Sequence, residues 1–169
     1  MGQILDYPNK REIIKQGLKN GLIIDTSLLM VYLIGFSDLE YLSKFSRTQN
    51  YRRDHFEWLE DLFKAIPKEK QLTTPNILTE VSDMTTRVAK IPREFPTVFG
   101  EFVVAAKEVY VESREVLNEP FSRLGIADCV SGRVAKIHDC PFVTTDEALV
   151  AELLEIKVKA FSIFWDFPK

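Results

Sequence analysis

The sequence is poor in cysteine, histidine and glycine. Its 169 residues include only two cysteines, two histidines and seven glycines. Cys129 and Cys140 belong to no CxxC pair, and neither histidine is spaced from them like a zinc ligand. We therefore expect two reduced thiols in a reducing compartment, with neither a disulfide nor a zinc site.

Membrane-length apolar runs and phosphate-binding loops are also missing. The longest apolar stretch, residues 22–36, is interrupted by Asp25 and is shorter than the roughly 20 residues of a membrane helix. The first residues carry charges and lack the apolar segment of a signal peptide. Neither GxGxxG nor GxxxxGK[ST] occurs, which argues against a nucleotide-binding α/β protein. We expect a cytoplasmic protein that does not contact a membrane.

The net charge of −3 argues against a broad basic surface for nucleic acid. It does not exclude a nuclease, because clustered catalytic acids themselves lower the net charge. Hydrophobic residues make up 46% of the chain, 12 of them Phe, which is enough for a sizeable core. Because no linker is visible, we expect residues 1–169 to form a single domain with an N-terminal helical extension at about residues 8–20.

Short apolar runs alternate with helical patterns along the chain. The apolar runs predict strands at 22–24, 71–73, 142–144 and 157–163. Apolar spacing and capping signals predict helices over 8–19, 28–34, 51–66, 75–89, 97–115, 126–138 and 147–155, with a polar loop and a short helix within 36–50. This alternation predicts an α/β protein with a central parallel sheet of about four to five short strands.

Four acidic residues occupy comparable places in this pattern. Asp25 and Asp146 each end a predicted strand, Glu80 lies within two turns of the helix that begins at Pro75, and Asp128 lies in the first turn of its helix. Groups at the carboxyl ends of parallel strands converge on one edge of the sheet. The sequence therefore predicts a single acidic cleft built from four distant segments.

The chemistry of such a cleft follows from electrostatic repulsion. Two carboxylates about 4 Å apart repel by roughly 4 kcal/mol at an effective dielectric constant near 20. Four of them require bound protons or a bound cation. Ligands that are all oxygen favour Mg²⁺ or Mn²⁺, and such an ion can activate water for hydrolysis of a phosphodiester.

The segments around the four acids resemble, in order, the motifs of PIN-domain ribonucleases. They are residues 22–27 (LIIDTS), 74–80 (TPNILTE), 124–128 (LGIAD) and 143–149 (VTTDEAL). The resemblance implies a PIN-like three-layer α/β/α fold and an endoribonuclease that depends on Mg²⁺ or Mn²⁺ and cuts RNA, with single-stranded RNA as the expected substrate. Asp25, Asp128 and Asp146 would hold the first metal ion, and Glu80 would complete the site through water or a second ion.

The same resemblance implies supporting groups and partners. Hydroxyls of Ser27 and of Thr144 or Thr145 would orient the acids. The protein would be a toxin neutralised by a small antitoxin protein or an RNA-processing enzyme, and a homodimer would join two clefts into one groove. The segment 36–70 is longer than in the smallest PIN toxins, and a helix precedes the first strand, so the toxin subclass stays open. Both additions could serve RNA binding, dimer contact or packing.

Each acid also has a purely structural explanation. Asp25 and Asp146 suit helix N-caps, Asp128 suits the first turn of a helix, and Glu80 suits a solvated helix face. The functional alternative is a non-catalytic PIN-fold module that binds RNA or protein. A phosphatase with an aspartyl nucleophile would normally carry a second Asp two residues after Asp25, where Ser27 stands.

The remaining polar and aromatic residues are expected to have ordinary roles. We expect His55 and His138 at the surface and three acids in solvent, namely Asp83, Asp139 and Glu147. Core packing is expected for most of the aromatic residues Tyr51, Phe56, Trp58, Trp165 and Phe167, although the first three could stack on bases. Two basic groups could meet phosphates or simply be solvated: Arg47, Arg52 and Arg53, and Arg123, Arg133 and Lys136.

Overall fold

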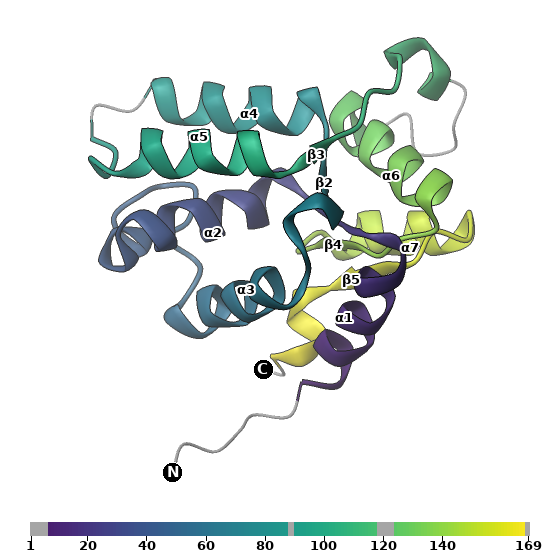
Figure 1. Cartoon of the computed structure of the whole chain (residues 1–169), viewed down its shortest axis with the longest axis horizontal. Helices are drawn as coiled ribbons and strands as arrows, with labels where there is room; N and C mark the ends of the chain where they lie inside the picture. Colours follow the sequence, from purple (N-terminus) through teal and green to yellow (C-terminus); the bar gives the residue numbers. More distant parts are fainter. Residues whose placement is uncertain (1–6, 88–89, 118–123, 168–169) are drawn as a thin grey trace.

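The computed structural model describes residues 7–87, 90–117 and 124–167. Its sheet has five strands, all parallel, in the order β3-β2-β1-β4-β5 (Figure 1). The strands are β1 (Leu22–Ile24), β2 (Gln71–Thr73), β3 (Lys107–Glu108), β4 (Phe142–Thr144) and β5 (Ala160–Ser162). The predicted α/β class, with four to five short parallel strands, is confirmed.

Helices surround this sheet in an arrangement consistent with three layers, α/β/α. Those in the described residues are α1 (Pro8–Asn20), α2 (Thr26–Ser37), α3 (Arg53–Ala65), α4 (Pro75–Thr86), α5 (Phe95–Ala105), α6 (Ile126–His138) and α7 (Glu147–Glu155). Figure 1 shows α2 with α4 and α5 on one side and α3 on the other, and α2 packs against all three. Among the described residues, no helix combines the length and apolar character needed to cross a membrane.

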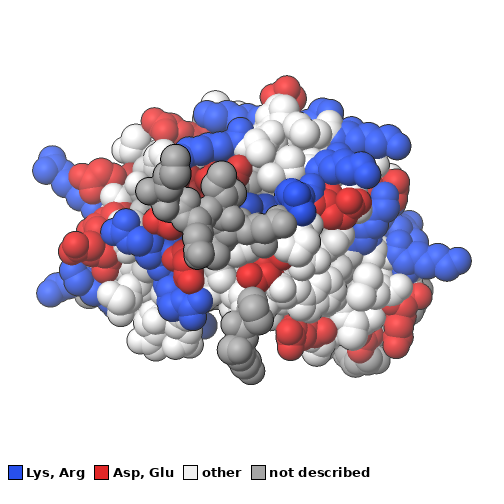
Figure 2. All heavy atoms as spheres, turned by 90° about the horizontal axis from the view of Figure 1, so that it is seen from below, with Lys and Arg blue, Asp and Glu red and all other residues white. Residues whose placement is uncertain are grey.

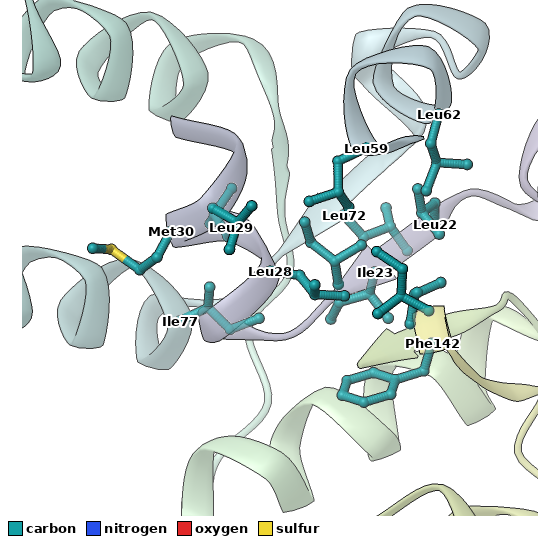
Figure 3. Close-up of a cluster of buried hydrophobic side chains, with 14 of the residues drawn as sticks. Leu22, Ile23, Leu28, Leu29, Met30, Leu59, Leu62, Leu72, Ile77 and Phe142 are labelled. Carbon is teal, nitrogen blue, oxygen red and sulfur yellow. The ribbon is translucent and has the colours of Figure 1, made fainter. Parts of the chain in front are cut away.

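Strand β1 lies at the centre of the sheet and is buried along its whole length. It pairs with β2 on one side and β4 on the other. A three-residue run of Leu and Ile suits this place, because a central parallel strand is covered on both faces. Figure 3 shows Leu59 and Leu62 of α3 packing toward Leu22 and Leu72, with Phe142 pointing away from them.

The chain order through the sheet creates a switch point beside β1. The chain moves outward from β1 to β2 and β3, then returns to β4 on the opposite side of β1 and continues to β5. In open parallel sheets, the crevice for a ligand forms outside the carboxyl ends of the strands at such a point. Asp25 follows β1 and Thr145 follows β4, so both lie at this position.

The predicted helices agree closely with the structure, except over residues 97–115. That prediction was wrong, because α5 ends at Ala105 and is followed by β3 and a 3-10 turn, Ser113–Val116. Lys107 and Glu108 are both exposed and pair with β2 at the edge of the sheet. Two charged residues on an edge strand carry no alternating apolar signal, so the apolar run before them suggested a continuing helix.

Two other boundaries differ by a few residues. The predicted last strand, 157–163, is shorter, because Lys157 has a φ of +63° after the end of α7 and pairing begins at Ala160. Helix α4 ends at Thr86, and the predicted end at residue 89 lies outside the described residues. Cys129 and Cys140 are buried free thiols, as expected.

The contact between α2 and α3 gives a test of packing. A Cβ added at Gly35 would lie 2.3 Å from the Cδ2 atom of the buried Phe56 ring, whereas a Cβ at Gly100 on α5 meets nothing within 4 Å. We expect Gly35→Ala to lower the free energy of unfolding by about 1–3 kcal/mol. The control Gly100→Ala should raise it by up to about 1 kcal/mol through helix propensity. Urea unfolding midpoints measure both effects, and equal shifts would contradict this packing.

Candidate functional site

Asp25 links the two central strands to the start of α2. Its Oδ1 accepts a hydrogen bond of 2.8 Å from the Leu28 amide and thereby caps α2. Its Oδ2 accepts a hydrogen bond from the hydroxyl of Thr144, the last residue of β4. Burial raises the pKa of Asp25 to about 6, although hydrogen bonds from Thr144, Leu28 and the Thr145 amide oppose this rise. The capping explanation is therefore correct, and the capped carboxylate also faces β4.

Asp146 holds the equivalent position after β4. Its Oδ1 accepts hydrogen bonds of 2.9 Å and 3.0 Å from the amides of Ala148 and Leu149 at the start of α7. Its own amide donates to the Thr144 hydroxyl oxygen at 3.0 Å. Thr144 thus contacts both acids, and the charge of Asp146 contributes to the raised pKa of Asp25.

Asp128 reaches the same region from α6. The residue before this helix, Gly125, has a φ of +111°, a conformation that favours glycine, and Asp128 lies in the first turn that follows. Burial is the largest cause, and together with the charges of Asp25, Glu80 and Asp146 it raises the pKa of Asp128 to about 6. All three other acids therefore act on Asp128, so the four form one electrostatic group.

Glu80 comes from α4 and is held by a neighbour of Asp25. Thr74 caps α4, with its side chain accepting from the Ile77 amide at 3.2 Å, and Pro75 is the first helical residue, as predicted. Glu80 Oε2 accepts a hydrogen bond of 2.5 Å from the hydroxyl of Thr26. The partly buried Glu80 therefore faces the acidic group and is not a fully solvated helix residue.

The supporting hydroxyls differ in part from those predicted. Thr144 contacts Asp25, and Thr145 Oγ1 lies 3.1 Å from the Tyr51 hydroxyl. Ser27 is exposed, and the hydroxyl that contacts an acid there belongs to Thr26. The sequence feature that could have identified Thr26 is its position directly after Asp25, the acid at the end of β1. Tyr51 packs against the core, as expected, and burial raises the pKa of its hydroxyl, with the Asp25 charge adding to the rise.

Two hollows flank the four acids. Glu80 lines one of about 420 Å³, together with Asn76 of α4 and Ile126 of α6. Asp146 lines the other, of about 630 Å³, which extends toward α3 and the C-terminal residues. The acids therefore lie between two spaces that a ligand could enter.

Two of the ordinary roles expected from the sequence need correction. His55 is only 4% exposed, because Tyr51, Phe164 and Phe167 surround its ring, so the surface position was wrong. Trp165, in the 3-10 turn Ile163–Asp166, is 44% exposed and makes a T-shaped ring contact with Phe161, so it does not belong to the core. His138 is partly buried as well.

The charged residues largely follow expectation. Three acids near the motifs are exposed: Asp83, Asp139 and Glu147. Arg47, Arg52, Arg53 and Lys136 are exposed too, Arg133 is partly buried, and Arg123 lies outside the described residues. On the face shown in Figure 2, basic and acidic side chains are interspersed, which agrees with the small net charge.

A divalent ion fits the chemistry of the donors. Carboxylate and hydroxyl oxygens surround the site, and two of the acids, Asp25 and Asp128, have raised pKa values, chiefly because they are buried. Within the described ranges, no three or more His, Cys, Asp or Glu side chains are gathered closely enough to hold an ion as they stand. The argument for a divalent ion therefore depends on two features of the site: its ligands are oxygen atoms, and its negative charge is not compensated.

The chain matches no protein-family model, and neither the curated proteins nor the solved structures give a match. The resemblance to PIN domains therefore depends on the four sequence motifs.

The raised pKa of Asp128, caused first by burial and then by the neighbouring acids, predicts how pH affects stability in the absence of divalent ions. The pKa of Asp128 is higher in the folded protein than its ordinary value of 3.8, so folding favours its protonated form. Stability should fall as the pH rises from about 4 to about 6, and the loss should be complete above that range. Asp128→Asn removes the charge, and we expect it to raise the melting temperature by about 2–6 °C at about pH 7.5, with little change at about pH 4.5.

A matched control for this measurement is Asp83→Asn, at an exposed acid one turn after Glu80. Its effect on the melting temperature in EDTA should be small and the same at both pH values. A stabilisation by Asp128→Asn that does not depend on pH would contradict the raised pKa of Asp128.

Proposed function

We propose that the protein is a metal-dependent endoribonuclease of the PIN type, which hydrolyses RNA phosphodiester bonds. One observation carries this proposal: burial and the charges of three other acids together raise the pKa of Asp128. These acids come from four separate segments and lie beside the switch point of a parallel sheet, where such folds bind ligands. The order of the four motifs along the chain adds support.

The proposed roles follow from the hydrogen bonds of each acid. Asp25, Asp128 and Asp146 would hold Mg²⁺ or Mn²⁺, with Glu80 completing the site through water or a second ion. When bound, the ion would supply positive charge and lower the pKa of a water molecule. Helix amides fix Oδ1 of both Asp25 and Asp146, which limits the rotation of each carboxylate. Thr144 and Thr26 orient Asp25 and Glu80.

We base the choice of single-stranded RNA as substrate on the motif resemblance. The proposed cytoplasmic location and the two possible biological roles have the same basis. In one role the protein is a toxin with an antitoxin partner, and in the other it processes RNA; a homodimer is compatible with both.

A non-catalytic PIN-fold module that binds RNA or protein is the second candidate. The observation in its favour is that the described acids do not form a ready-made group of three around an ion.

Cleavage of RNA tests the nuclease directly. The wild-type protein should cut single-stranded RNA in the presence of Mn²⁺ and stop cutting in EDTA. Asp25→Asn should lower the rate by at least about 10–100-fold, the range typical of groups that only support a metal ligand. Asp83→Asn should cut at the wild-type rate. Equal cutting by wild type and Asp25→Asn would mean a contaminating nuclease or another site.

Metal binding can be tested without a substrate. Mn²⁺ should raise the melting temperature, because an ion that binds only the folded state stabilises it by about 2.7 kcal/mol at 100 times its Kd. Protons compete for Asp25 and Asp128, whose pKa values are about 6, so the rise should be larger at about pH 7.5 than at about pH 5. Asp128→Asn should reduce it. If Mn²⁺ has no effect on wild type at either pH, the non-catalytic module is the better description.

A further inference from the structure

The larger hollow beside the acids has an aromatic wall. Phe164 and Phe167, from the C-terminal segment, line the hollow together with His55 of α3, and Asp146 lines it as well. His55 makes edge-on contacts with both rings, with centroid distances of 5.8 Å to Phe164 and 4.6 Å to Phe167. Figure 1 shows this C-terminal segment close to α1 and α3. The hollow therefore joins an aromatic surface to the acidic group.

Part of this aromatic wall is open. Phe164 is 40% exposed, although the contact with His55 supports one edge of its ring. The hollow has a volume of about 630 Å³, within the usual range for small-ligand sites. A flat, partly exposed ring in such a space offers a stacking surface for another planar group.

Polar groups are present on the same wall. His55 Nδ1 accepts a hydrogen bond of 3.1 Å from the Arg52 amide, so the proton of the neutral ring is on Nε2. Burial lowers the pKa of His55, which keeps the ring neutral at pH 7. Nε2 makes no hydrogen bond to any residue that the structure describes, and it is therefore a donor for a ligand. The Arg52 side chain also lines the hollow and is 65% exposed, although it pairs with Asp54.

We propose that this hollow binds one unpaired nucleobase of the RNA, adjacent to the phosphodiester that is cut. The base would stack on Phe164 and accept a hydrogen bond from His55. This inference rests on the proposed function, because it assumes that RNA is cut at the acidic group to which Asp146 belongs. It also gives a reason for a single-stranded substrate, since a base in a duplex is already stacked on both faces and paired along its edge.

Two neighbouring aromatic residues provide a matched test. Phe164 and Trp165 lie in the same 3-10 turn with similar exposure, but only Phe164 lines the hollow. Binding of a fluorescent single-stranded RNA of about eight nucleotides would be measured at low salt in EDTA, where no cleavage occurs. We expect Phe164→Ala to weaken binding about 10-fold and Trp165→Ala to change it less than about 2-fold. Melting temperatures would establish that both variants are folded.

The outcomes separate this inference from the nuclease proposal. If Phe164→Ala alone weakens binding but wild type does not cut RNA with Mn²⁺, the base site stands and the nuclease proposal fails. If wild type cuts RNA in an Asp25-dependent manner while the two aromatic variants bind equally, the base site is overturned and the nuclease stands. Absence of RNA binding by the wild type, or an equal effect of Phe164→Ala on double-stranded RNA, also overturns the base site.

Discussion

The attachment of Asp25 to β4 is the interaction on which the arrangement of the site depends. The Asp25 amide donates to the Val143 carbonyl at 3.0 Å, and its carboxylate accepts from the Thr144 hydroxyl. Asp25 stands between a fully buried strand and a helix that is buried over most of its surface, so its charge is taken into a poorly solvated place. The hydrogen bonds make that burial tolerable without removing its effect on the pKa.

Structural and functional explanations of these acids are not alternatives here. Asp25 and Asp146 each cap a helix through Oδ1, as their sequence context suggested. A carboxylate has a second oxygen and further lone pairs, so one side chain can cap a helix and still contribute charge to a shared site. Capping also fixes the side chain relative to its strand. The helix starts therefore position the acids that the proposed chemistry requires.

Much of the fold could be predicted because its central elements have strong local signals. Strand β4 and helices α6 and α7 begin and end where the sequence pattern predicted. Strand β3 was missed because its two residues are charged and acquire their conformation only by pairing with β2. The convergence of the four acids could be predicted once the sheet was assumed to be parallel. The contacts of Thr26 and the burial of His55 could not, because both depend on segments distant in the chain.

Electrostatics also bears on the choice between a nuclease and a binding module. A folded protein that only binds RNA gains nothing from burying Asp128 beside the charges of Asp25, Glu80 and Asp146, because phosphates are repelled by the same charges. Asparagine at position 128 would occupy nearly the same volume without that repulsion. In the proposed function, a divalent ion would compensate these charges and would also attract the phosphodiester. The burial of Asp128 among three other acidic charges is therefore the feature that most clearly favours the proposed metal-dependent hydrolysis over binding alone.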